Sequence, residues 1–153
     1  MSSKLEHSYQ IIIQATPEQV WQALTDSRYT TQYFPGTAVE SDWQPGSDYV
    51  QKRGDAVAFD GKVVVSDRPR RLVQTVHMKF DPAVIGHKEI TLSWDIEQMG
   101  ESCMLTVVHE GFESDRKLFE RLTGHCPHTL SGIKTLLETG KPLSMPQPVA
   151  AER

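Results

Sequence analysis

The sequence of 153 residues has little cysteine, no long apolar run and no excess of basic residues. Its two cysteines, Cys103 and Cys126, are too few for a disulfide scaffold and lack the spacing of a zinc site. No apolar run approaches the roughly 20 residues that a membrane-spanning helix needs. The net charge of −4 argues against a nucleic-acid-binding surface, because phosphate binding depends on clustered Lys and Arg. We therefore expect no nucleic-acid partner and no membrane insertion.

Motifs of the common catalytic classes are also absent from the sequence. It contains no glycine-rich phosphate loop, no Gly-x-Ser-x-Gly elbow, no His-Glu-x-x-His and no Cys-x-x-Cys. We therefore expect neither a cofactor nor a metal, and no motif assigns a catalytic residue. The N-terminal residues Met1 to His7 lack the apolar segment of a secretory signal, so we expect a cytoplasmic protein with reduced thiols.

An amphipathic helix with clear ends is predicted near the C-terminus, over residues 127–139. Its apolar residues recur at helical spacing on one face, and they are Leu130, Ile133, Leu136 and Leu137. Pro127 suits the first helical turn, Gly140 suits the position just after the helix, and Pro142 prevents its continuation. Nearly all of the upstream sequence has the pattern of strands. We expect this helix to bury its apolar face against a curved antiparallel sheet.

The first part of the chain predicts a strand followed by two short helices. The strand is expected over residues 9–14. Thr16 is the expected N-cap of the first helix, with Pro17 at the first helical position and Gln19 completing a capping box. The second helix is expected over residues 28–34.

From residue 37 onward the pattern becomes extended. Strands are predicted over residues 37–42, 49–53, 56–66, 72–80, 90–97 and 103–110, with a bulge or tight bend at Asp60–Gly61. A short helix over residues 116–122 precedes the terminal helix. The expected fold class is α+β, with a curved antiparallel sheet of about six to seven strands wrapped around the long C-terminal helix. One domain is expected over residues 1–142, with a flexible tail over 143–153.

Several segments of the sequence resemble one known family. They are residues 16–26 (TPEQVWQALTD), 39–47 (VESDWQPGS), 61–63 (GKV), 68–72 (RPRRL), 109–112 (HEGF) and 130–140 (LSGIKTLLETG). In this order they are similar to the START-like (SRPBCC) superfamily, which has the helix-grip fold. Within it they resemble the branch named after the activator of Hsp90 ATPase homologue 1 (AHSA1-like).

This resemblance implies a deep cavity between the sheet and the C-terminal helix, which in this family often accepts hydrophobic small molecules. Relatives include lipid carriers, polyketide cyclases and aromatases, an antibiotic-sequestering resistance protein and the Hsp90 co-chaperone domain. The resemblance therefore implies no single activity. Members often associate as dimers, so a homodimer is one expected assembly.

The large aromatic residues have two interpretations, which are core packing and contact with a ligand. In a fold whose core is divided by a cavity, several of them should line that cavity. The residues predicted to contact a ligand are Trp43, Tyr49, Phe59, His77, Trp94, His109, Phe119, His125 and Gly132. Among them the histidines would orient the ligand, and Gly132 would permit a close approach to the sheet or to the ligand.

Two groups of polar residues are candidates for chemistry. His109 and Glu110 end the last predicted strand, where a His–Glu pair can act in general acid–base catalysis. Neighbours on a strand point to opposite faces, so at most one of the two faces the cavity, and a structural role is the alternative. His125, Cys126 and His128 resemble a metal cluster, but a zinc site needs three or four ligands. We interpret them as solvent-exposed residues at the entry of the helix.

Three functions are compatible with the sequence. The leading hypothesis is a non-enzymatic protein that binds a hydrophobic or aromatic small molecule. The second is a cyclase- or hydrolase-like enzyme with His109 or Glu110 as the base, which predicts a perturbed pKa inside the cavity. The third is an interaction module like the Hsp90 co-chaperone domain, which predicts an exposed apolar patch.

Overall fold

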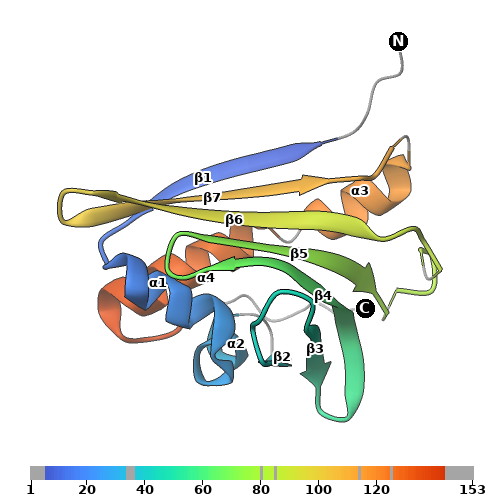
Figure 1. The fold of residues 1–153 in the computed structure, drawn as a ribbon, viewed down its shortest axis with the longest axis horizontal. Helices are drawn as coiled ribbons and strands as arrows, with labels where there is room; N and C mark the ends of the chain where they lie inside the picture. The colour runs from blue at the N-terminus through green and yellow to red at the C-terminus, as the bar shows by residue number, and fades with distance from the viewer. Residues whose placement is uncertain are drawn as a thin grey trace, which may run out of the picture.

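The computed structural model describes residues 6–33, 37–79, 81–84, 86–113, 115–124 and 126–143 (Figure 1). Seven strands in these residues form one sheet: β1 (His7–Ile13), β2 (Thr37–Ser41), β3 (Asp48–Arg53), β4 (Ala56–Asp67), β5 (Arg71–Met78), β6 (Ile90–Met99) and β7 (Ser102–Glu110). The helices are α1 (Pro17–Thr25), α2 (Ser27–Tyr33), α3 (Arg116–Thr123) and α4 (Cys126–Thr139). The predicted fold class is confirmed, and the ends of the predicted elements differ from these by at most two residues.

All neighbouring strands of the sheet are antiparallel, in the order β1-β7-β6-β5-β4-β3-β2. Strands β2 to β7 therefore pair in chain order, whereas β1 pairs with the last strand. In that pairing His7 lies opposite His109, and Ile13 lies opposite Cys103. Figure 1 shows the sheet curving over α1, α2 and α4, which lie together on one side of it.

Thr16 starts α1 in the way that the sequence predicts. Its Oγ1 accepts a hydrogen bond of 3.1 Å from the backbone N–H of Gln19, and the Gln19 side chain accepts one of 2.9 Å from the backbone N–H of Thr16. This reciprocal capping box gives partners to two N–H groups that the helix itself leaves unpaired. The helix then buries Val20, Trp21 and Leu24 in the core.

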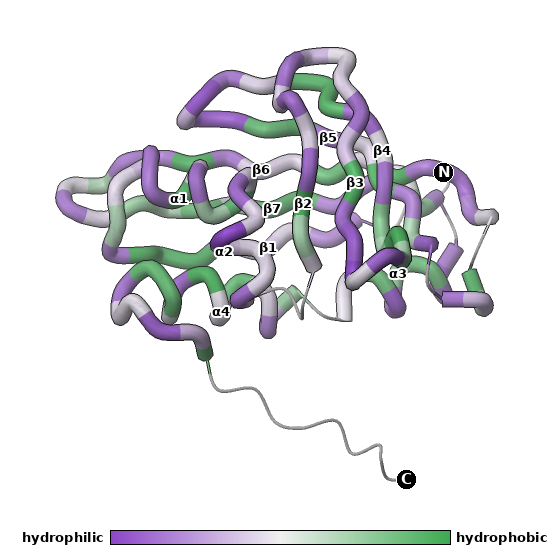
Figure 2. Tube along the Cα trace, turned by 90° about the horizontal axis from the view of Figure 1, so that it is seen from below, coloured by the Kyte–Doolittle hydropathy of each residue, from purple (hydrophilic) through white to green (hydrophobic). Residues whose placement is uncertain are grey.

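Helix α4 supplies an apolar face to the core. Leu130, Ile133 and Leu136 are buried, and Leu137 packs at the edge of the same cluster. Figure 2 shows hydrophobic residues along α4 and within the strands, while hydrophilic residues dominate the hairpin ends. The predicted packing of this helix against the sheet is confirmed.

Helix α4 also approaches α2 closely, at Gly132. A Cβ atom at this position would lie 3.0 Å from Cβ of Tyr33, so a side chain here would require Tyr33 to shift. The Tyr33 hydroxyl donates a hydrogen bond of 2.7 Å to the carbonyl oxygen of Ala23 in α1. Burial raises the pKa of this phenol well above its usual range. Gly132 therefore lets α4 pack closely against α2. Through Tyr33, which also bonds to Ala23, the three helices α1, α2 and α4 are in contact.

Two register shifts of β4 lie away from the bend predicted at Asp60–Gly61, which stays a prediction. The pairing of β4 with β5 shifts register between Val63 and Val65. An extra residue reverses the alternation of side chains, so Val63 is buried whereas Val65 is 36% exposed. The pairing of β3 with β4 has a second shift, next to Gln51.

At Gly61 the backbone of β5 leaves no room for a side chain on β4. A Cβ atom at Gly61 would lie 2.0 Å from the carbonyl oxygen of Thr75. The next residue, Lys62, donates its backbone N–H to the Thr75 hydroxyl over 2.8 Å. No side chain fits at Gly61 unless the two strands separate.

The helices of the described residues are all too short or too polar to cross a membrane. The tail predicted for residues 143–153 falls almost entirely outside the described residues. It stays a prediction.

We expect Gly61→Ala to lower the free energy of unfolding by about 3 kcal/mol, because the added methyl group overlaps the Thr75 carbonyl group. Urea denaturation monitored by circular dichroism measures the change. The control is Lys62→Ala, which removes only an exposed side chain and its ion pair with Asp48 and should change stability little. Equal stability of wild type and Gly61→Ala would contradict the close approach of β4 and β5.

Candidate ligand-binding site

A cavity of about 370 Å³ lies between the sheet and the helices. Strands β2 to β7 and all four described helices contribute to its wall. Most of the lining residues are apolar or aromatic: Leu24, Tyr33, Val39, Trp43, Phe59, Val76, Leu92, Trp94, Val107, Leu122 and Leu130. The size falls in the range of about 300–1,000 Å³ that is typical of small-molecule sites.

The cavity lies between two clusters of buried apolar residues. The first cluster includes Ile13 of β1 and Ile133 of α4, and the second includes Ile90 of β6 and Leu118 of α3. Leu92 packs against both clusters and also lines the cavity. The core of this fold is therefore divided by the cavity.

Four residues from the predicted ligand contacts line the cavity, and they are Trp43, Phe59, Trp94 and His109. Trp43 follows β2 with a positive φ of 55°, a strained conformation for a large residue. Its backbone N–H donates a hydrogen bond of 3.0 Å to the Ser41 hydroxyl, and its ring meets the ring of Tyr49 edge to face at 6.4 Å. These contacts hold the Trp43 side chain at the cavity wall.

Tyr49 lies behind the cavity wall and is not among its lining residues. It is 1% exposed, and its hydroxyl donates a hydrogen bond of 2.7 Å to the carbonyl oxygen of Thr75. Burial raises the pKa of Tyr49 well above its usual range, although a hydrogen bond with Gln74 lowers it in part. Gln74 also accepts a hydrogen bond of 3.2 Å from the indole N–H of Trp94. The network orients Gln74 and Trp94, which both line the cavity.

The remaining predicted contacts lie elsewhere. His77, Phe119 and Gly132 are not among the lining residues. A ring nitrogen of His77 lies 2.6 Å from the carbonyl oxygen of His87, so His77 joins β5 to the following loop. Phe119 packs edge to face against Phe112 at 5.1 Å. His125 lies outside the described residues, and its ligand contact stays a prediction.

His109 is the buried histidine of the cavity wall. It is 8% exposed, and its Nδ1 has no hydrogen-bond partner among the described residues. The ring of His7 on β1 lies beside it, with the ring centres 5.4 Å apart. Burial lowers the pKa of His109 to about 4, and repulsion from His7 contributes to this shift. His109 is therefore neutral at physiological pH.

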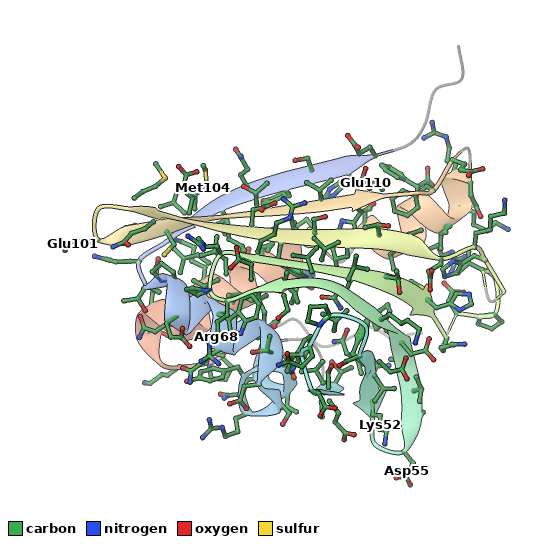
Figure 3. All side chains as sticks on the ribbon, in the orientation of Figure 1. Lys52, Asp55, Arg68, Glu101, Met104 and Glu110 are labelled. Carbon is green, nitrogen blue, oxygen red and sulfur yellow. The ribbon has the colours of Figure 1, made fainter. Side chains whose placement is uncertain are left out.

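His109 and Glu110 lie on opposite faces of β7, as strand alternation predicts. Glu110 is exposed at the end of the strand (Figure 3), whereas His109 faces the cavity. Burial raises the pKa of the Cys126 thiol, which also lines the cavity, to about 11. The thiol is therefore protonated at neutral pH, and it is no thiolate nucleophile in this state.

Several lining residues were not predicted. Helices α1, α2 and α3 contribute Leu24, Tyr33 and Leu122, which are ordinary apolar positions in the sequence. The inward position of Gln74 could have been predicted to matter, because a polar residue at an inward position of an apolar strand indicates a polar contact in the interior. Cys126 and His128, predicted to be solvent-exposed, line the cavity as well. The prediction is wrong for Cys126, which is buried, whereas His128 is exposed.

The polar part of the lining contains no carboxylate among the described residues. It consists of Thr30, Gln51, Arg53, Gln74, His109, Cys126, His128 and Thr129. No group of three or more His, Cys, Asp or Glu in the described part of the chain is arranged to hold a metal ion. The arrangement offers an apolar enclosure with a few hydrogen-bonding groups.

Acidification should destabilise the protein through His109. Its pKa is about 4 in the folded protein and 6.5 in its unperturbed state, so between these values the unfolded chain binds a proton that the folded protein excludes. Stability therefore falls as the pH falls through this window, by about 2 kcal/mol between pH 7.5 and pH 5. Urea denaturation at both pH values measures the effect, and His109→Leu should lack this part of it. An identical pH dependence in both proteins would contradict the neutral state of His109.

Solved structures share this fold at low sequence identity. MLL2253 from Mesorhizobium loti superposes with a TM-score of 0.74 at 18% identity, over 88% of this chain and 97% of that chain. The Aha1 dimer from Colwellia psychrerythraea superposes with a TM-score of 0.73 at 18% identity. The match covers 90% of this chain and 98% of that chain. DynU16, from the dynemicin biosynthetic locus, superposes with a TM-score of 0.74 at 22% identity, over 90% of this chain. This chain spans about half of that protein (48%). Identities this low establish the fold alone.

No curated protein sequence matches this chain at a significant level. The sequence profile of one family, described as activator of Hsp90 ATPase homolog 1-like protein, matches residues 14–138. This range runs from the end of β1 through almost all of α4 and contains every described residue that lines the cavity. Because the match covers most of the chain, the protein belongs to the activator of Hsp90 ATPase homolog 1-like family.

Proposed function

We propose that this protein binds a hydrophobic small molecule in the cavity between its sheet and α4. The observation that carries the proposal is the divided core, in which an apolar cavity of about 370 Å³ separates two buried clusters. Each 100 Å² of apolar ligand surface buried there contributes about 2.5 kcal/mol before the costs of binding. The Trp94–Gln74 hydrogen bond and the neutral His109 supply polar groups that orient the ligand.

The perturbed pKa of His109 inside the cavity favours an enzyme as the second candidate. An imidazole with a pKa of about 4 is a weak base at neutral pH. Glu110, the other candidate base, is exposed on the opposite face of β7. Among the described lining residues no carboxylate supports His109, so the geometry favours binding over catalysis.

An interaction module would need an exposed apolar patch. The large apolar side chains that are exposed among the described residues are Ile12, Val64, Val65 and Met99. They come from three strands, and only Val64 and Val65 are adjacent in sequence. The predicted homodimer stays a prediction, for which the outer strands β1 and β2 offer backbone groups for pairing.

The binding proposal is tested with two neutral probes, the linear 1-decanol and the aromatic 2-(2-naphthyl)ethanol. Isothermal titration calorimetry should show binding with a negative heat-capacity change, the mark of buried apolar surface. Val76→Phe adds a ring where a buried valine lines the cavity, so we expect at least about tenfold weaker binding of both probes.

The matched control is Val64→Phe, which makes the same substitution on β4 at a side chain that is 49% exposed. This variant should bind both probes like the wild type. Failure of the wild type to bind either probe would contradict the proposed function. Unchanged binding by Val76→Phe would show that the probes bind outside this cavity.

A further inference from the structure

We propose that the ligand of this cavity is an apolar carboxylic acid and that His109 is the residue that receives its acidic group. This inference rests on the proposed binding function and adds the chemical class of the ligand. Two independent features of the wall support it. The first is a buried imidazole without a hydrogen-bond partner, and the second is a lining that, among the described residues, contains basic side chains and no carboxylate.

The His109 imidazole is more than nine-tenths buried and lines the cavity. Its Nδ1 is completely enclosed without a partner, and the same is true of Nδ1 in the neighbouring His7. Buried polar groups in native proteins almost always form hydrogen bonds, because an unpaired one costs free energy. Because Nδ1 is enclosed by protein beside His7, a ligand in the cavity would meet the other ring nitrogen, Nε2. Since a neutral imidazole offers a lone pair on one nitrogen, the group that it best receives is an acidic O–H.

The described part of the cavity wall contains basic side chains but no acidic ones. The protein as a whole has 20 acidic and 16 basic residues. The described lining residues nevertheless include Arg53, His109 and His128 and no Asp or Glu. A cationic ligand would therefore find no carboxylate countercharge in this part of the wall.

The start of α4 adds to the same electrostatic preference. Cys126, His128 and Thr129 of its first turns line the cavity, and the first turn contains no acidic residue. The N-terminus of a helix carries a partial positive charge of about half a unit, which favours an anionic group nearby. This end of the cavity therefore stabilises the carboxylate form of a bound acid.

The bound acid and His109 share one proton. A free carboxylic acid is ionised at pH 7 and His109 is neutral, so formation of the complex takes up one proton from the solvent. This proton lies between the two groups, either as a carboxylic O–H that donates to the neutral ring or as an imidazolium N–H that donates to the carboxylate. A carboxylate beside the ring also opposes the effect of burial on His109, whose pKa is about 4 in the free protein. Binding of the acid should therefore raise the pKa of His109.

The test compares three probes with the same aromatic body at pH 7: 2-naphthylacetic acid, 2-(2-naphthyl)ethanol and 2-(2-naphthyl)ethylamine. Calorimetry should show the acid binding about tenfold more tightly than the alcohol, with the amine weakest. His109→Leu should remove the preference for the acid and leave the affinity for the alcohol nearly unchanged. His77→Leu, a histidine outside the lining, is the matched control and should keep the preference.

A measurement on the wild type keeps the proposal testable if a variant does not fold. Imidazole NMR signals followed against pH should show the pKa of His109 rising by at least about one unit when 2-naphthylacetic acid is bound, and not with the alcohol. An unchanged pKa in the acid complex, or an acid preference that survives in folded His109→Leu, would overturn the role of His109.

The affinities also separate this inference from the proposed function. Alcohol binding that equals or exceeds acid binding would overturn the acid class and leave the binding function standing. If none of the three probes, nor 1-decanol, binds the wild type, both proposals fail.

Discussion

The burial of α4 against the sheet is the contact on which both the core and the cavity depend. Leu130 and Ile133 are fully buried in a cluster that also contains Ile13 of β1 and Leu105 of β7. The first turn of the same helix lines the cavity through Cys126. One helix therefore packs the core along its length and forms part of the binding wall at its start. Any displacement of α4 changes both.

The cavity wall combines features that destabilise a protein when no ligand is present. A cavity of about 370 Å³ lacks the side-chain packing that a continuous core would have at the same place. The neutral, unpartnered imidazole of His109 and the positive φ of Trp43 add further costs at the same wall. Such departures from optimal packing gather at functional sites, where an occupant recovers part of the cost by binding only the folded state. Their coincidence around one cavity supports a binding role.

Much of the fold was predictable because its signals are local. The capping box at Thr16 needs only four adjacent residues, and the apolar face of α4 follows from helical spacing within one segment. The lining residues were harder to predict, because an inward aromatic residue looks the same whether it meets a ligand or another side chain. Trp94 and Tyr49 show this, since the first lines the cavity and the second lies behind its wall.

By itself the sequence determined the order and the approximate ends of the elements, the fold class and the alternation that puts His109 and Glu110 on opposite faces. The tertiary structure decided that His109 is the one that faces the cavity. Only the tertiary structure decided where the core divides, that Gly132 meets Tyr33, and that His7 lies beside His109 although the two are far apart in the chain. The physical reason is that periodicity and caps depend on neighbours along the chain. A cavity and the pKa of a buried histidine depend on the groups that several distant elements bring together.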